Sequence, residues 1–164
     1  MKRDFIKWEV LTAAPLVKEC EGLRLEAYIC PAGVATIGYG HTAGVKLGTR
    51  ITQADADRML TLDLEKIKRR AASYILVPVT QGQFKALTSL IYNIGDLRKK
   101  APKLLAYLNA GNTQAAAKEF LDIGSIKKRD AQGNVIYDEA GKVVYVQSRG
   151  LALRRKKEME AFLS

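Results

Sequence analysis

Apolar residues recur at helical spacing over long stretches of the chain, and two of these stretches begin with a capping box. Thr52 with Asp55 opens ADADRMLTLDLEKIKRRAAS, which predicts a long helix over residues 52–74. Thr80 with Gln83 opens QFKALTSLIYNIG, whose wide apolar face is typical of a buried helix. We therefore expect the second helix to form the centre of a helical lobe.

The remaining C-terminal segments extend that lobe over residues 78–164. KLLAYLNAG and NTQAAAKEFLDIG each have helical spacing and end in glycine, and LALRRKKEMEAFLS predicts a basic amphipathic helix at the end. Before it, Asp130–Tyr137 and Asp138–Tyr145 repeat the pattern Asp-x-x-Gly-x-Val-x-Tyr. Because strand-forming residues follow each turn-forming run, we predict a β-hairpin inserted at 130–146.

The N-terminal third predicts a short helix followed by a small sheet. Thr12 as N-cap, Pro15 in the first turn and Gly22 at the end frame the helix. The pattern then changes to glycines and β-prone pieces, and AYICPAGVATIGYGHT predicts strand, turn and strand, with the turn at 31–33. We expect a small β lobe over roughly 23–50.

These elements predict a single domain, 1–164, of the α+β class and mainly helical, in which the long helix joins the small β lobe to the helical lobe. A hydrophobic content of 48% can fill one core. No apolar run approaches the roughly 20 residues that span a bilayer, and the start MKRDFIKWEVLTAAPLVKE is charged throughout. We therefore expect no signal peptide and no transmembrane segment. The net charge of +10 attracts a polyanion, such as nucleic acid, a bacterial envelope or an acidic membrane.

The residues available for chemistry favour carboxylates. Cys20, Cys30 and His41 are the only cysteines and histidine, and they lack the spacing of a zinc site. A Ser/His or Cys/His nucleophile system would have to form around that one histidine. We therefore expect no metal and no cofactor.

Glu21 stands out among the carboxylates because it ends the predicted N-terminal helix. Unpaired carbonyls at a helix C-terminus disfavour a negative charge, and the neighbouring Leu23 and Leu25 would add apolar surroundings. A glutamate kept protonated in this way suits a general acid. On these physical grounds alone, a solvated glutamate at a helix end is the more common outcome.

The segment ECEGLRLEAYICPAGVATIGYGHT resembles the signature of phage-type lysozymes, or endolysins. In that family a helix-end Glu-Gly is followed by an aromatic, an acidic residue, a glycine turn and Thr-Ile-Gly-Tyr-Gly-His. The resemblance continues in order through TQGQFKALTSLIYNIG, LLAYLNAGNTQAAAKEFL and RGLALRRKKEMEAF, over nearly the whole chain. It implies a lysozyme-like fold and hydrolysis of the β-1,4 bond between N-acetylmuramic acid and N-acetylglucosamine in peptidoglycan, for host-cell lysis.

The resemblance also implies catalytic roles. Glu21 matches the general acid, whereas Cys30 and Thr36 stand where the family has an aspartate and a threonine that hold and activate a water or stabilise an oxocarbenium-like centre. Cys30 departs from the family. A thiolate can serve as base or covalent nucleophile if its pKa falls from about 8.5 toward neutral, but a neutral thiol can do neither well. We hypothesise that Cys30 keeps the role; an inactive or Glu21-only enzyme, and either stereochemical outcome, stay open.

Supporting roles follow from the same resemblance. His41 is expected to hold the small sheet to the helical lobe by pairing with a carboxylate, and Arg154 to approach Glu21, although each could also lie exposed. Tyr92 and Asn93 resemble cleft-facing positions, but aromatics at helical spacing are more often core, so we leave both out of the catalytic set. A regulatory disulfide between the two cysteines stays open.

Peptidoglycan is the partner that the resemblance implies, for a monomeric enzyme made in the host bacterial cytoplasm and acting in the periplasm or cell wall after release. The basic C-terminal helix could also contact the anionic outer membrane, or be a solvated helix face. No DNA-reading signature is visible, and we expect no nucleic-acid partner. The alternative function is a catalytically inactive basic module that binds cell wall or nucleic acid. The repeat at 130–146 is either a decoration or a contact with the substrate groove.

Overall fold

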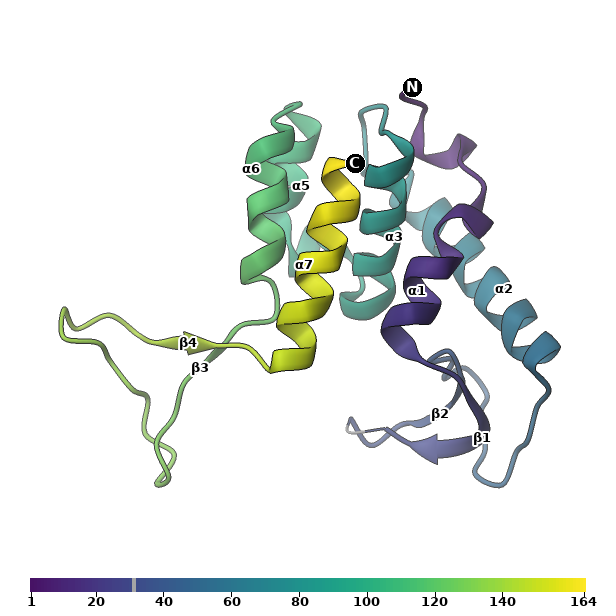
Figure 1. Cartoon of the computed structure of the whole chain (residues 1–164), viewed down its shortest axis with the longest axis horizontal. Coiled ribbons are helices and arrows are strands. Elements are labelled where there is room, and N and C mark those ends of the chain that lie inside the picture. The colour runs from purple at the N-terminus through teal and green to yellow at the C-terminus, as the bar shows by residue number, and fades with distance from the viewer. Residues whose placement is uncertain (31) are drawn as a thin grey trace.

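The computed structural model describes residues 1–30 and 32–164, and its helices gather into one lobe from which a small sheet and a thin arm extend (Figure 1). Along the chain the elements are the 3-10 helices η1 (Phe5–Lys7) and η2 (Val10–Thr12), α1 (Ala14–Glu21), β1 (Arg24–Ile29), β2 (Ala35–Gly38), α2 (Gln53–Ala71), α3 (Gln81–Ile94), α4 (Leu97–Lys100), α5 (Pro102–Asn109), α6 (Thr113–Glu119), the 3-10 helix η3 (Phe120–Asp122), β3 (Ile126–Lys127), β4 (Tyr145–Val146) and α7 (Arg149–Leu163). The predicted α+β, mainly helical class is confirmed.

Both predicted capping boxes are present and start the two long helices. The Thr52 hydroxyl accepts from the Asp55 amide at 3.1 Å, and the Asp55 carboxylate accepts from the Thr52 amide at 3.0 Å. Thr80 and Gln83 make the same reciprocal bonds at the start of α3. Because α3 packs against α1, α2 and α7, its apolar positions lie at the centre of the core, as its pattern predicts.

The short helix α1 begins later than the sequence predicts. Thr12 is not its N-cap: the residue ends η2, and its hydroxyl donates to the Glu9 carbonyl at 2.7 Å. Ala13 precedes the helix without a side-chain cap, and Pro15 supplies the first-turn signal instead. The other end is as predicted, since Gly22 stops the helix with a positive φ of 71°.

The small sheet pairs β1 with β2 in antiparallel register. Tyr28 lies opposite Thr36, and the register is irregular between Arg24 and Tyr28. An isolated β-bridge pairs Glu26 of β1 with Arg50, which lies at the C-terminal end of the β lobe. The predicted turn between the strands includes Pro31, which lies outside the described residues.

The insertion consists of a stem and two small loops that meet at a centre, and it is not the single hairpin that the repeat predicts. β3 pairs with β4 as a stem, and each repeat closes its own small loop, with bridges between Arg129 and Val135 and between Tyr137 and Val143. At the centre, three amides bond in a ring: Lys128 to Val144, Val144 to Ile136 and Ile136 to Lys128, at 2.8 to 3.0 Å. The repeat has an eight-residue period, and this brings equivalent residues together around a centre. We call residues 126–146 the arm.

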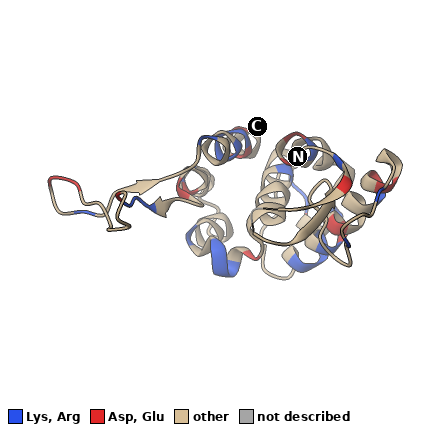
Figure 2. Cartoon of the chain, turned by 90° about the horizontal axis from the view of Figure 1, so that it is seen from below, with Lys and Arg blue, Asp and Glu red and all other residues tan. Residues whose placement is uncertain are grey.

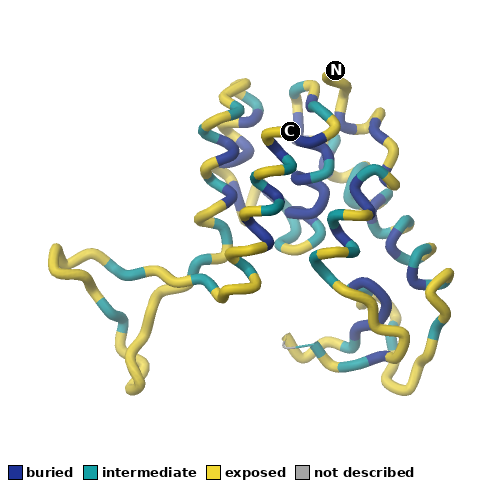
Figure 3. The backbone as a smooth tube through the Cα atoms, viewed as in Figure 1, coloured by how far each residue is buried: buried dark blue, intermediate teal, exposed yellow. Residues whose placement is uncertain are grey.

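Burial separates the helical lobe from its two extensions. One cluster of buried apolar residues runs from Phe5 to Phe162 and includes the N-terminal segment, α2, α3 and the C-terminal helices. Figure 3 shows exposed backbone along most of the arm and along parts of the β lobe. Within the described residues, no helix combines the length and apolarity needed to cross a membrane.

Candidate active site

Glu21 is the last residue of α1, and its two carboxyl oxygens face different groups. Oε1 accepts from an Arg154 guanidinium nitrogen at 2.5 Å. Oε2 lies toward the backbone of Gly40, where a Cβ would approach it to 3.3 Å. The Glu21 side chain is 20% exposed, whereas Leu23 and Leu25 are exposed and do not supply the expected apolar surroundings. A charged partner and a close backbone therefore define the site around Glu21.

Arg154 is fixed by a buried network that the sequence did not predict. Its Nε donates to Glu158 at 3.0 Å and a terminal nitrogen donates to the Ser89 carbonyl at 3.1 Å, while the Ser89 hydroxyl donates to Glu158 at 2.7 Å. Burial lowers the pKa of Arg154, but the carboxylates of Glu21 and Glu158 outweigh that effect and raise it overall. The guanidinium is thus a fixed cation beside Glu21. The i, i+4 spacing of Arg154 and Glu158 was the one signal for this pair.

The basic run in α7 is only partly a solvated face. Arg154 and Arg155 are buried, and Arg155 donates to Glu158 and to Asn93. Of the following lysines, Lys157 pairs with Glu19 at 2.5 Å. The basic face of α7 is therefore smaller than expected, because Arg154 and Arg155 are buried in the protein interior. Figure 2 shows Lys and Arg spread over several elements instead of one helix.

Cys30 and Thr36 meet at the end of the sheet. The Cys30 amide donates to the Val34 carbonyl at 3.0 Å, and the Gly33 amide donates back to the Cys30 carbonyl at 2.8 Å. Thr36 is buried, and its hydroxyl donates to the Val34 carbonyl at 2.9 Å. The pKa of the Cys30 thiol is lowered, first by the backbone amide of Val34 and then by the neighbouring Thr36 hydroxyl and Ala32 amide.

The turn after Cys30 has two counterparts in the arm, both of which begin with aspartate. The Asp130 amide donates to Asn134 at 2.9 Å and the Gly133 amide donates back at 3.0 Å, while the carboxylate accepts from the amides of Gln132 and Asn134. Asp138 makes the same set of bonds. The Cys30 turn is therefore a type that holds an aspartate carboxylate against two backbone amides.

The two cysteines differ in their surroundings. Both are free thiols, and burial raises the pKa of Cys20, whereas hydrogen bonding lowers that of Cys30. A thiolate is the reactive form of cysteine, so these surroundings favour ionisation of Cys30 over that of Cys20.

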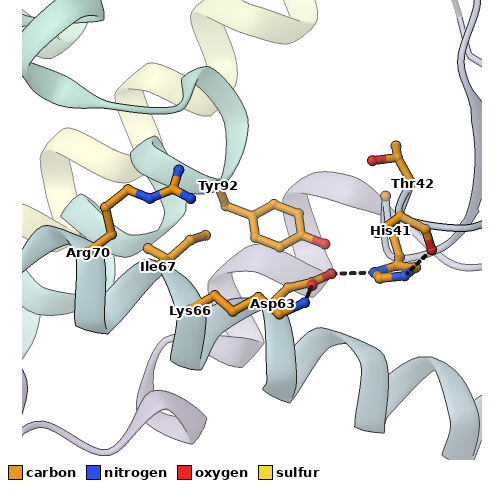
Figure 4. Close-up of a pocket in the computed structure, with 9 residues that line it drawn as sticks. His41, Thr42, Asp63, Lys66, Ile67, Arg70 and Tyr92 are labelled. Atoms are coloured by element: carbon orange, nitrogen blue, oxygen red, sulfur yellow. Dashed lines mark hydrogen bonds and ion pairs between the residues drawn. The ribbon is translucent and has the colours of Figure 1, made fainter.

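His41 links the β lobe to the long helix. Its Nδ1 lies 2.6 Å from Asp63 Oδ2 in α2, and its Nε2 lies 3.0 Å from the Ala43 carbonyl. Figure 4 shows this pair at the edge of a pocket of about 260 Å³, which Lys66, Ile67 and Arg70 of α2 also line. The carboxylate partner, Asp63, carried no sequence signal because its position in α2 is that of an ordinary polar helix residue.

Tyr92 lines this pocket and, like Glu21, lies against Gly40, although sequence reasoning left it out of the site. Its hydroxyl donates to the Tyr39 carbonyl at 2.7 Å, and its ring lies 3.6 Å from the point where a Gly40 Cβ would be. Burial, followed by the charges of Asp63 and Glu21, raises its pKa far above its ordinary value. Tyr92 therefore stays a neutral donor that fixes the strand end beside Glu21.

Solved structures with the same arrangement of helices and sheet define a lysozyme-like class. The endolysin from Escherichia coli O157:H7 phage FAHEc1 aligns with a TM-score of 0.74 at 33% identity, covering 93% of this chain and 91% of its own. The muramidase domain of SpmX from Asticaccaulis excentricus aligns with a TM-score of 0.74 at 31% identity, covering 93% and 95%.

Sequence comparisons identify the family. The phage lysozyme model matches residues 18–158. The endolysin of Salmonella phage P22 is 35% identical over 90% of this chain and 92% of its own, and that of Bacillus phage B103 is 37% identical over 91% of this chain, which spans 51% of that relative. The chain belongs to the phage lysozyme family, and its enzyme class is that of the lysozymes, glycoside hydrolases that degrade peptidoglycan.

Proposed function

We propose that the protein is a muramidase that hydrolyses the β-1,4 bond between N-acetylmuramic acid and N-acetylglucosamine, with Glu21 as general acid, Cys30 as base or nucleophile and Thr36 as the residue that positions water. The observation that carries the proposal is the turn at Cys30, which has the hydrogen-bond pattern of two aspartate turns in the same chain. A thiolate held in this way supplies the negative charge for which the family uses aspartate.

Glu21 would donate its proton from Oε2. Oε1 is occupied by Arg154, so the proton has to reside on the oxygen that faces Gly40. In bond breaking, that proton passes to the glycosidic oxygen while the bond from this oxygen to the sugar C1 breaks. The fixed cation at Arg154 then stabilises the carboxylate that remains.

Two routes for Cys30 follow from the same geometry. As a base, the thiolate takes a proton from a water that Thr36 holds, and the resulting hydroxide attacks C1 with inversion. As a nucleophile, it attacks C1 itself, and water later cleaves the sulfur–carbon bond with retention. The second route predicts a mass increase on Cys30 when a slow substrate is trapped, which intact-protein mass spectrometry measures.

Substitution and alkylation test the proposal on purified peptidoglycan sacculi. Glu21→Gln and Cys30→Ala should each reduce solubilisation by about 100-fold or more, as loss of a general acid or base does. Iodoacetamide should inactivate the wild type near neutral pH, because the pKa of Cys30 is lowered and that of Cys20 raised. Cys20→Ser is the matched control and should remain both active and sensitive. Full activity of Cys30→Ala would remove the proposed role of the thiol.

We further propose that the enzyme is monomeric, is made in the host bacterial cytoplasm and acts on the cell wall after release. Cytoplasmic expression should leave host cells intact until chloroform opens the inner membrane, after which turbidity should fall with wild type but not with Glu21→Gln. Equal lysis by both proteins would favour a binding or membrane-disrupting module. A contact with the anionic outer membrane has weaker support, because Arg154 and Arg155 are buried.

A further inference from the structure

The arm exposes large apolar side chains that no part of the core covers. Ile126 is 67% exposed, Tyr137 59% and Tyr145 58%. Two tyrosines and an isoleucine on one thin extension are unusual for a surface that only faces water. Tyrosine combines apolar area with low conformational entropy, which suits a binding surface.

The arm is also organised before any partner arrives. The ring of backbone bonds through Lys128, Ile136 and Val144 fixes its centre. At its base, the side-chain Nε2 of Gln147 donates to the carbonyls of Leu121 at 3.0 Å and Ile123 at 2.8 Å. Binding to such a surface loses little chain entropy.

A groove of about 730 Å³ runs along the stem of the arm. It is lined by Ser125, Ile126, Lys127, Lys128, Arg129, Tyr145 and Val146. Three of these side chains are cationic and none is acidic. The nearest carboxylate in sequence, Asp130, accepts from backbone amides of its own turn. The groove therefore combines positive charge with apolar area.

The arm begins beside the helix that serves the active site. Gln147 anchors its base and α7 follows at Arg149, so Arg154, which contacts Glu21, lies about 7.5 Å further along the helix at 1.5 Å per residue. In Figure 1 the β1–β2 sheet lies below the end of α1 and the arm extends from the start of α7, so both lie on the lower side of the molecule as drawn.

We propose that the arm binds the acidic stem peptides of the peptidoglycan strand that occupies the active site. Lys127 and Lys128 pair with free carboxylates of the stem peptides, while Ile126 and Tyr145 cover their apolar parts. Charge complementarity and the absence of acidic side chains in the groove favour this occupant. The assignment rests on the proposed function, since that function supplies the strand.

Binding to purified sacculi tests the arm in the full-length Glu21→Gln protein, in which hydrolysis is blocked. Lys127→Gln/Lys128→Gln should weaken retention about 3- to 10-fold, the effect of two exposed charge pairs. The matched control is Lys2→Gln/Arg69→Gln, which removes the same charge from the N-terminal segment and the last turn of α2. Figure 1 places the N-terminus far from the arm, and this control should bind like the parent.

A second binding experiment uses glycan strands from which an amidase has removed the stem peptides. On immobilised strands of this kind, the parent, the control and the arm variant should bind equally. Equal binding of arm variant and control on intact sacculi would overturn the proposal, and so would a deficit of the arm variant that persists on stripped strands. With Glu21 intact, the arm variant should hydrolyse stripped strands at the wild-type rate. Failure of the muramidase assignment would instead appear as undiminished hydrolysis by Glu21→Gln.

Discussion

Cys30 and Asp130 occupy the same position in two copies of one turn, the first at the end of the β sheet and the second in the arm. In each turn, the amide of the first residue donates to the carbonyl of the residue four positions later, and its carbonyl accepts from the amide of the glycine three positions later. The side chain of the first residue lies against two backbone amides. Backbone amides stabilise an anion whether it is a carboxylate or a thiolate. The turn thus provides an internal reference for what Cys30 can do.

The reference predicts that Cys30→Asp folds and remains active. Its activity should extend to lower pH than that of the wild type, because a carboxylate stays ionised where a thiol is protonated. The wild-type activity should fall as pH decreases through the lowered pKa of Cys30. A pH–rate profile on sacculi measures both acid limbs, with Cys30→Ser as the variant that has no anion. Identical acid limbs for wild type and Cys30→Asp would show that Cys30 does not act as the anion.

Glu158→Gln should destabilise the protein by about 3–5 kcal/mol, because the buried Arg155 then loses its carboxylate partner, while Arg154 keeps only the carboxylate of Glu21. Glu160→Gln, an exposed change on the same helix, should stay within about 0.5 kcal/mol of the wild type. Urea unfolding of the two variants measures the difference. Similar midpoints would mean that the Arg154 network contributes little to the fold.

Gly40→Ala and Gly44→Ala separate backbone strain from contact with the acid. Both glycines have positive φ, 91° and 70°, so alanine should cost about 1–2 kcal/mol of stability at either position. Only Gly40 would bring a Cβ to 3.3 Å from Glu21 Oε2, while Gly44 has open space. Hydrolysis should therefore fall in Gly40→Ala and persist in Gly44→Ala at a temperature where both are folded. Equal rates of hydrolysis in the two variants would show that close contact between residue 40 and Glu21 does not affect catalysis.

The bond between His41 and Asp63 should hold the β lobe to α2 with a coupling energy of about 1.5–3 kcal/mol, as for hydrogen bonds to charged groups. A double-mutant cycle with His41→Ala and Asp63→Asn measures it by urea unfolding. Lys66→Gln is the control, since that lysine is exposed and lies 3.4 Å from the same aspartate. A coupling indistinguishable from zero would leave the lobes joined by packing alone.

Local signals in the sequence predicted local structure well. Thr52 and Thr80 cap their helices because a capping box needs only residues within one turn. Thr12 had the right residue type but the chain bends first into a 3-10 turn, in which its hydroxyl is used. The repeat predicted a single hairpin, but its two units are held by isolated bridges and by a centre that three separate segments form.

Long-range partners could not be predicted from composition or spacing. Arg155 belongs to a basic run that is usually solvated, yet it is fully buried beside Glu158 and Asn93. Asp63 and Tyr92 reach the site only because the β lobe folds back onto α2 and α3. Such contacts join residues that are distant along the chain, and the hydrophobic periodicity of one segment does not indicate which other segment it contacts.

The direct pairing of Ile126 with Val146 means that the chain enters and leaves the arm at one point. A segment joined in this way can be gained or lost in evolution as a cassette, without a change in the path of the helix that follows. Substrate preference could then diversify in the arm while the catalytic residues stay under separate selection.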